Sequence, residues 1–162
     1  MPTRITATID PARSRTDART EQGQPISMDA DPPEGDNSAA GPKEVLLAAL
    51  AGCTGMDVAS ILRKKRQAAT AYEIVVSGES ADEHPKVFTT ITVEHRVSGA
   101  VDAEALKRSI ELSATRYCPV NAMLSASVTI THRYQLTGAD GAVAEALVAV
   151  TGPEGARVAP KA

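Results

Sequence analysis

The stretch GPKEVLLAALAGCTGMDVASILRKKR, from Gly41 to Arg66, decides the fold of this chain. Pro42 suits the first turn of a helix, where its missing N–H is not needed, and the Glu44 carboxylate is favoured there by the helix dipole. Four basic residues close the stretch, where the dipole favours positive charge. The pattern predicts one helix over residues 42–67, about 39 Å long at a rise of ~1.5 Å per residue.

The first half of this helix is apolar all round, which is typical of a helix that is buried on every side. Its small residues leave room for another element to approach closely; they are Ala48, Ala49, Ala51, Gly52 and Gly55. One of only two cysteines in the chain, Cys53, lies among them. A core of such small aliphatic residues is thin, so we expect a subunit interface to supplement it.

Length and composition indicate a soluble domain. The 162 residues suit one domain with a hydrophobic core, or at most two small lobes. The net charge of −3 argues against nucleic acid as a partner, because phosphate binding needs a basic face. The N-terminus has no apolar stretch of the signal-peptide kind, and the apolar run between Glu44 and Asp57 is shorter than the ~20 residues that span a bilayer. We therefore expect a cytoplasmic protein without a membrane partner.

The remaining elements favour an α+β fold. Strands are predicted at residues 3–10, 25–30, 71–80, 86–99 and 127–136. A second helix is predicted over 101–117, with Asp102 as its N-cap. Residues 1–137 are expected to form one domain, with an N-terminal hairpin (1–40) and a helix–sheet core (41–137). The tail, residues 138–162, is rich in Ala, Gly and Pro, and we expect it to be loose with some helix at 142–150.

Cys53 and Cys118 admit two interpretations. As a dithiol pair they would perform redox chemistry, in which one thiolate attacks a peroxide and the second thiol condenses with the resulting sulfenic acid. As core fillers they would simply be buried, as free cysteines often are. Asp57, one turn after Cys53, would oppose thiolate formation if it faced the same pocket. Composition and spacing leave both interpretations open.

The three histidines lack the clustered spacing of a metal site, so we assign no metal ligand. His84 is predicted to lie in a turn, and His95 and His132 in strands. A histidine within hydrogen-bond reach of Cys53 would instead indicate a thiol hydrolase or an acyl-transfer enzyme.

Two motifs resemble the OsmC/Ohr family (osmotically inducible protein C and organic hydroperoxide resistance protein). GPKEVLLAALAGCTGMDVASIL has Pro-x-Glu at the helix start and Ala-Gly-Cys further on, and SATRYCPVNAML contains Tyr-Cys-Pro. The apolar strand SVTITHRYQL follows them. The resemblance covers residues 25–136 and is closer to an OsmC-like branch than to Ohr itself.

The resemblance implies an OsmC-like fold, with antiparallel sheets packed on two central helices in an intertwined homodimer whose sites lie at the interface. It implies that Cys53 is the peroxidatic cysteine and Cys118 the resolving cysteine. It also implies that Glu44 positions an activating arginine from the N-terminal hairpin. Arg13, Arg15 and Arg19 are the candidates, and Arg15 is the one chosen. Glu44 precedes Cys53 by nine residues, whereas related sequences have ten.

The implied activity is that of a thiol peroxidase of the oxidative stress response. It would reduce organic hydroperoxides, with hydrogen peroxide as a further substrate, and would take electrons from a dithiol such as a lipoylated protein. No metal, flavin or haem is needed for this chemistry. The alternative is a non-catalytic dimer that binds a small apolar ligand in the interface pocket.

Overall fold

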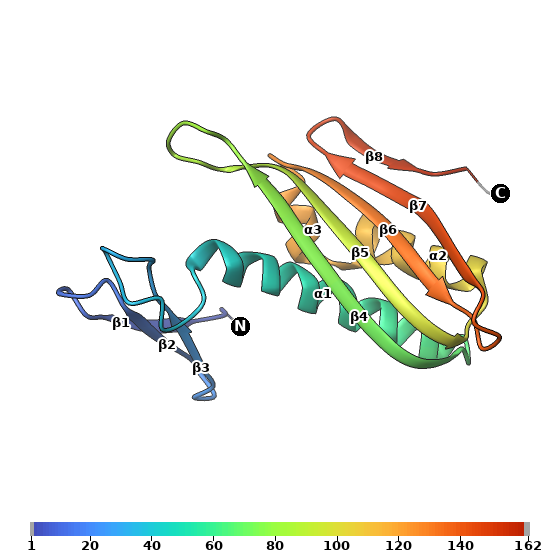
Figure 1. The fold of residues 1–162 in the computed structure, drawn as a ribbon, viewed down its shortest axis with the longest axis horizontal. Coiled ribbons are helices and arrows are strands. Elements are labelled where there is room, and N and C mark those ends of the chain that lie inside the picture. Colours follow the sequence, from blue (N-terminus) through green and yellow to red (C-terminus); the bar gives the residue numbers. More distant parts are fainter. Residues whose placement is uncertain (1, 161–162) are drawn as a thin grey trace. The chain divides into compact units, whose positions relative to one another are not determined.

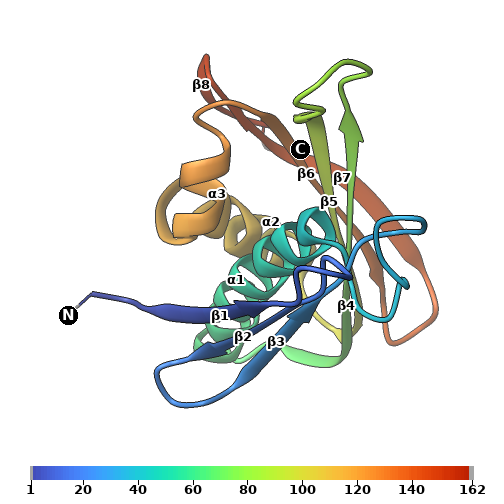
Figure 2. The same cartoon turned by 90° about the vertical axis from the view of Figure 1, so that its left-hand side faces the viewer.

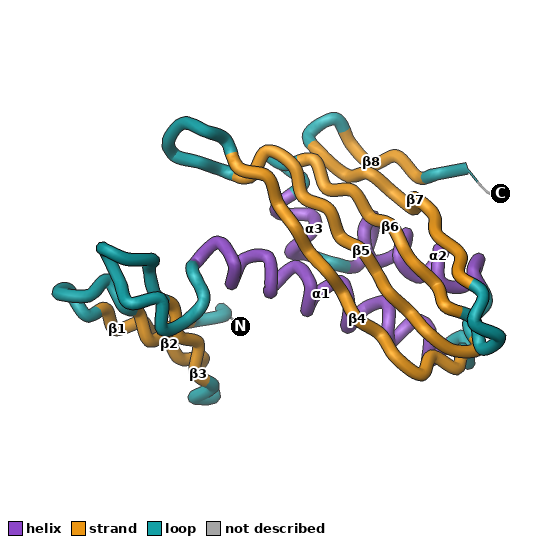
Figure 3. The backbone as a smooth tube through the Cα atoms, in the orientation of Figure 1, coloured by secondary structure: helices purple, strands orange, loops and turns teal. Residues whose placement is uncertain are grey.

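The computed structural model of this chain describes residues 2–160, in which two sheets and a set of helices follow one another (Figure 1). The residues form two units, the first ending at Leu46 and the second beginning at Leu47. Figure 3 separates the strands from the helices by colour. This mixture of helices and sheets confirms the predicted α+β class.

The first unit contains a three-stranded antiparallel sheet in the order β1-β2-β3. Its strands are β1 (Ile5–Ile9), β2 (Thr16–Thr20) and β3 (Pro25–Met28). The sequence predicted the two outer strands. The segment between them was expected to be a hairpin or loop, but it is the strand β2, which pairs with both neighbours. The following loop is organised by Asp29, whose carboxylate accepts hydrogen bonds from Ser38 N at 2.8 Å and Ser38 Oγ at 2.7 Å.

The long helix α1 (Pro42–Lys64) begins where the sequence predicted and ends three residues earlier. At its start, Gly41 N–H donates to Glu44 Oε2 at 2.7 Å, so the glutamate carboxylate caps an otherwise unpaired donor of the first turn. At its end, Arg66 adopts a positive φ of 56°. That left-handed conformation cannot continue a right-handed helix, which explains the earlier end.

Within a single chain, α1 buries only one stripe of side chains, where the sequence predicted burial on every side. The buried residues are Leu50, Thr54, Val58 and Leu62, spaced four apart along the helix. Gly55 allows the helix to approach β4 (Ala68–Ser80), because a Cβ at this position would lie 2.7 Å from Ile74 Cδ1. Gly52, in contrast, is exposed, and a Cβ there would meet nothing within 4 Å.

The second unit contains a five-stranded sheet in the order β4-β5-β6-β7-β8. After β4 its strands are β5 (Phe88–Ala100), β6 (Thr129–Thr137), β7 (Val143–Gly152) and β8 (Gly155–Val158). β5 and β6 are parallel, because the helical segment between them carries the chain back to the same end of the sheet. The sheet is therefore mixed, and the prediction of purely antiparallel sheets was wrong for this pair.

The C-terminal segment also differs from its prediction. Residues 138–162 were expected to be loose with some helix at 142–150, but β7 pairs with β6 and β8 pairs with β7. Val148 and Ala149 are buried in the core. The Ala-rich composition suits a helix, and pairing with the open edge of β6 overrides that preference.

Three consecutive helical segments lead from β5 to β6, namely α2 (Ala103–Leu112), the π-helical turn η1 (Ser113–Tyr117) and α3 (Pro119–Leu124). The predicted N-cap is confirmed, since the Asp102 carboxylate accepts a hydrogen bond from Ala105 N at 2.8 Å. The predicted helix over 101–117 loses its α geometry after Leu112 and widens into η1. Together with α1, these segments lie on one face of the five-stranded sheet (Figure 2).

Candidate functional site

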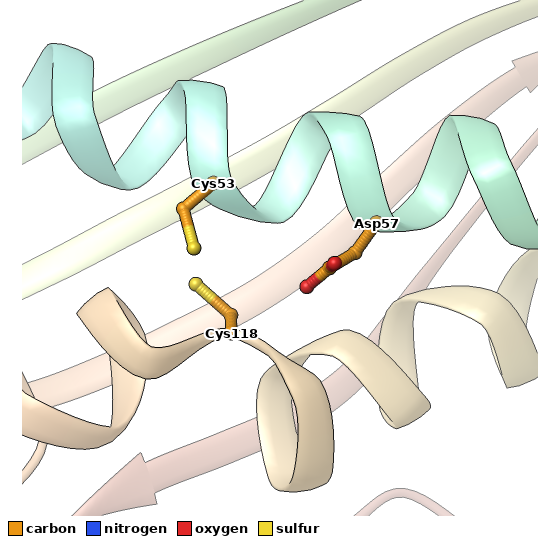
Figure 4. A group of neighbouring side chains, drawn as sticks. All are labelled: Cys53, Asp57 and Cys118. Atoms are coloured by element: carbon orange, nitrogen blue, oxygen red, sulfur yellow. The ribbon is translucent and has the colours of Figure 1, made fainter. Parts of the chain in front are cut away.

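Cys53 and Cys118 face each other between α1 and the start of α3 (Figure 4). Both are free thiols; Cys53 is partly exposed and Cys118 is buried. Asp57, one helical turn after Cys53, points to the same place, and one ligand atom from each of the three residues lies within 4.8 Å of the other two. The structure thus brings together the two cysteines, and it adds a carboxylate to them.

The position of Cys118 follows from the break between η1 and α3. Its N–H donates to Ser113 O at 3.0 Å, which closes the wide π turn, and its backbone is extended, with φ −75° and ψ 103°. The residue before a proline prefers this conformation, so Pro119 both ends one helix and begins the next. Cys118 Sγ then accepts the Asn121 N–H at 3.3 Å. Wide turns of this type are frequent at functional sites.

Two buried hydroxyl groups orient Asp57. Ser113 Oγ donates to Asp57 Oδ2 at 3.0 Å, and Thr54 Oγ1 lies 2.9 Å from the same Ser113 Oγ. Both hydroxyl-bearing residues are fully buried. Sequence reasoning named Asp57 only as a conditional opponent of thiolate formation, and it missed Ser113, which reaches Asp57 only because η1 packs against α1.

The electrostatic surroundings make the two cysteines unequal. Burial raises the pKa of Cys118 to about 12, and the hydrogen bond with Cys53 and the charge of Asp57 act in the same direction. The Asn121 N–H opposes this rise, because it stabilises a negative sulfur. Cys118 is therefore a neutral thiol near pH 7, which suits it poorly to attack a peroxide first.

Behind Cys118 lies a buried polar chain that includes two of the three histidines. Tyr72 Oη lies 2.7 Å from His95 Nδ1, and the His95 and His132 rings stack with centroids 6.0 Å apart. His132 Nε2 lies 2.9 Å from Asn121 Oδ1, and Asn121 also binds Cys118. Burial lowers the pKa of His95 to about 3 and that of His132 to about 4, so both imidazoles are neutral.

These histidines do not serve Cys53 as a base. The second ring nitrogen of each, His95 Nε2 and His132 Nδ1, is buried without a hydrogen-bond partner among residues 2–160. The geometry that would have favoured a thiol hydrolase is therefore not present in the described part of the chain. His132 instead supports Asn121 and, through it, the turn that holds Cys118, and His95 stacks on His132.

The other two predicted site residues belong to the first unit. Arg15 binds Asp17, with Nη2 to Oδ1 at 3.2 Å, and also donates to Ser38 Oγ. The hydrogen bond with Asp17 raises the pKa of the Arg15 guanidinium. Glu44 is engaged by Gly41 N–H at the start of α1. Both residues thus have partners within their own unit.

Comparison with known proteins identifies the family. Residues 35–133 match the family described as OsmC-like protein. The chain is also 39% identical over 118 residues to the protein YhfA of Escherichia coli K12, a match that covers 72% of this chain and 86% of YhfA. The chain belongs to the OsmC-like protein family. The resemblance in its two cysteine motifs is thereby confirmed.

Solved structures agree with this OsmC-like fold. A hypothetical protein from Aquifex aeolicus is 25% identical, with a TM-score of 0.76 over 85% of this chain and 98% of that one. The organic hydroperoxide resistance protein OhrB of Bacillus subtilis has a TM-score of 0.60 over 83% and 98% of the two chains. At 14% identity, the latter likeness concerns the fold alone.

The apolar composition of α1 is unusual for a helix of this length. This helix is long and apolar enough to cross a membrane by length and composition alone. Part of this apolar surface packs in the core of the second unit, with Leu50 in one buried cluster and Val58 and Leu62 in another. The comparisons therefore identify the family and the fold of this chain.

Proposed function

We propose that this OsmC-like protein is a cysteine-based peroxidase that reduces organic hydroperoxides. The observation that carries the proposal is the pair of free thiols, one partly exposed and one buried, that face each other across α1 and α3. An accessible thiol can meet a peroxide, and a buried neighbour can close a disulfide onto it without a large movement of either helix.

The proposed reaction has two steps. The Cys53 thiolate attacks the terminal peroxide oxygen, the O–O bond breaks, and the alcohol leaves after it takes up a proton, so that Cys53 becomes a sulfenic acid. The Cys118 thiol then attacks the Cys53 sulfur, and a disulfide and one water form. A dithiol reductant restores both thiols by disulfide exchange, and a lipoylated protein is a candidate for this donor.

The apolar surroundings of the thiols support an alkyl rather than a small polar peroxide. Cys118 belongs to a core cluster with Leu50 and Ile130, and Cys53 packs against that cluster. Leu47 and Leu124 are partly buried beside it. Apolar side chains favour an apolar substituent on the peroxide, because its transfer from water is favourable.

The activating cation of Cys53 is part of the proposal. A thiolate needs a local positive field, whereas Asp57 adds negative charge to the site. We assign the cation to Arg15, with Glu44 as the residue that positions it. Both assignments rest on the family resemblance alone.

A second copy of the chain is the proposed partner of α1. The helix exposes small or apolar residues on the side away from its buried stripe, among them Ala48, Ala49, Gly52 and Met56. Family members are commonly dimeric, and such a surface allows close packing of two helices. We propose that the homodimer is cytoplasmic and acts in the oxidative stress response.

A non-catalytic role is the second candidate function. The carboxylate of Asp57 beside the two thiols favours it, because negative charge opposes a reactive thiolate. In that case the same apolar surroundings would bind a small ligand, and the cysteines would not turn over.

Steady-state peroxide consumption distinguishes the two functions. With cumene hydroperoxide, dihydrolipoamide and a chelator present, the wild type should turn over repeatedly and Cys53→Ser should not. Folding of the variant is checked by circular dichroism. If Cys53→Ser retains multi-turnover activity, or if the wild type consumes no peroxide, the peroxidase proposal is wrong.

A further inference from the structure

The three side chains at the site have the donor atoms of a metal centre. Cys53 Sγ, Cys118 Sγ and a carboxylate oxygen of Asp57 all lie within 4.8 Å of one another. Zn–S bonds of about 2.3 Å in a tetrahedral site place two sulfurs roughly 3.8 Å apart. The existing arrangement therefore needs only small side-chain shifts to converge on one ion.

The helical spacing already aims two of these donors at one point. Residues four apart on a helix lie on the same face, so Cys53 and Asp57 project from α1 side by side (Figure 4). Cys118 faces them from the turn before α3. These donors come from two separate segments and already lie close together before any ion binds. This reduces the free-energy cost of organising the site.

Charge also favours a cation here. Asp57 is partly buried, and among residues 2–160 it forms no ion pair. A divalent cation would neutralise this carboxylate and stabilise both thiolates, because coordination removes the thiol protons. The two thiols and the carboxylate are thus complementary to a metal ion.

Neighbouring hydrogen bonds would orient the ligands. Ser113 Oγ holds Asp57 Oδ2 at 3.0 Å and leaves the other carboxylate oxygen for an ion. Asn121 N–H lies 3.3 Å from Cys118 Sγ, and such a donor stabilises a metal-bound thiolate. Supporting contacts of this type fix the orientation of metal ligands.

We propose that the reduced protein binds one zinc-class divalent cation per chain through Cys53, Asp57 and Cys118. Two thiolates and one carboxylate favour Zn²⁺ over the hard cations Mg²⁺ and Ca²⁺, which prefer all-oxygen sites. A water molecule completes the tetrahedron, and the partial exposure of Cys53 and Asp57 allows the ion to enter.

The ion and the peroxide compete for the same sulfur atoms. Binding of Zn²⁺ to the two thiols releases two protons. If the proposed peroxidase function holds, reaction of the zinc dithiolate with one hydroperoxide and two protons yields the disulfide, an alcohol, one water and free Zn²⁺. The disulfide sulfurs are no longer thiolates, so oxidation releases the ion. Only the reduced form of the protein then binds the metal.

The test uses Co²⁺ as a spectroscopic probe on the reduced, tag-free, full-length chain without peroxide. One equivalent of Co²⁺ should produce thiolate-to-cobalt charge-transfer absorption, which one equivalent of Zn²⁺ abolishes by displacement. Asp57→Asn should weaken binding at least about tenfold, because loss of even a residue that only supports a metal ligand costs roughly 10–100-fold and Asp57 is a proposed ligand. The matched control Asp82→Asn, at an exposed position between β4 and β5, should bind as the wild type does.

Several outcomes would overturn the proposal. The first is a cobalt spectrum without charge-transfer absorption. The second is an Asp57→Asn variant that binds Zn²⁺ with unchanged affinity. The third is a Cys53→Ser variant that circular dichroism shows to be folded and that keeps the full charge-transfer intensity. Because this assay contains no peroxide and the peroxidase assay contains a chelator, failure of one proposal leaves the other measurable. Retention of Zn²⁺ after diamide oxidation would contradict its expulsion by the disulfide.

Discussion

At the scale of single residues, the site is defined by the unequal burial of two thiols. Cys53 is partly exposed, whereas Cys118 is only 2% exposed and its thiol is held neutral by burial. The cysteines themselves could be found from sequence, because each lies in a recognisable motif. Ser113 and Asn121 could not, because each acquires its contact with the site only through the wide turn η1, which no local pattern predicted.

This inequality predicts a trapped intermediate in Cys118→Ser. The variant should accept one oxidation at Cys53 and then stop, because no thiol remains to displace the sulfenic hydroxyl. Dimedone labelling with mass spectrometry should find one adduct per chain, on Cys53. The absence of an adduct on Cys53 after peroxide treatment would mean that Cys53 is not the attacking thiol.

At the scale of elements, α1 and the C-terminal strands show where sequence patterns succeed and where they fail. The helix start was predictable, because Pro42 and Glu44 act through local bonds of the first turn. The strands within residues 143–158 were not predictable. β7 forms by pairing with β6, and the composition of residues 143–158 gives no sign of that partner. Interactions between residues close in sequence were enough to predict α1, whereas β7 depends on its pairing in the assembled sheet.

The exposed face of α1 predicts the effect of Gly52→Gln. The larger side chain meets nothing within the chain and improves helix propensity by about 1 kcal/mol, so the monomer should be at least as stable. If α1 packs against a second copy, this variant should shift the protein from dimer to monomer in sedimentation velocity. Glu104→Gln, an exposed position on α2, is the control. A Gly52→Gln protein that remains dimeric would exclude this face as the interface.

The two C-terminal strands should differ in their tolerance to truncation. A chain that ends after Gly152 loses only β8, whose residues are all exposed, and should still fold. A chain that ends after Thr137 also loses the buried Val148, which alone is worth roughly 1.5–3 kcal/mol. Soluble expression and urea unfolding of both truncations measure this. Equal stability of the two would contradict the core role of β7.

At the scale of the whole molecule, sequence reasoning recovered the fold class, the family and the position of the long helix α1. It misjudged the sheet, because parallel pairing of β5 with β6 depends on how α2, η1 and α3 carry the chain between them. It also could not foresee that His95 and His132 stack in the core, since strand periodicity gives the face of each residue but not its neighbour across the sheet. Such pairings are properties of the assembled molecule.

The buried histidines make stability depend on pH. In the folded chain their pKa values are about 3 and about 4, against 6.5 for the ordinary imidazole. Below pH 6.5 the unfolded chain takes up protons that the folded chain does not, so stability must fall as pH falls. At pH 5 each histidine should remove roughly 2 kcal/mol. Asp29, whose pKa is lowered to about 2, stabilises the fold fully above its ordinary pKa of 3.8 and loses this contribution only as the pH falls below that value.

Urea unfolding at pH 7.5 and 5.0 checks this dependence. The free energy of unfolding of the wild type should fall clearly between the two values, and it should fall less in His132→Gln, which has lost one of the two groups. An identical decrease in wild type and variant would assign the pH dependence to other groups.

The central claim is that Cys53 and Cys118 form a disulfide when the protein meets a hydroperoxide. The most direct measurement is a thiol count with intact mass on the reduced, metal-free protein, before and after one equivalent of cumene hydroperoxide. The account predicts loss of both thiols per chain and a mass lower by two hydrogens. Two surviving thiols and an unchanged mass would contradict it.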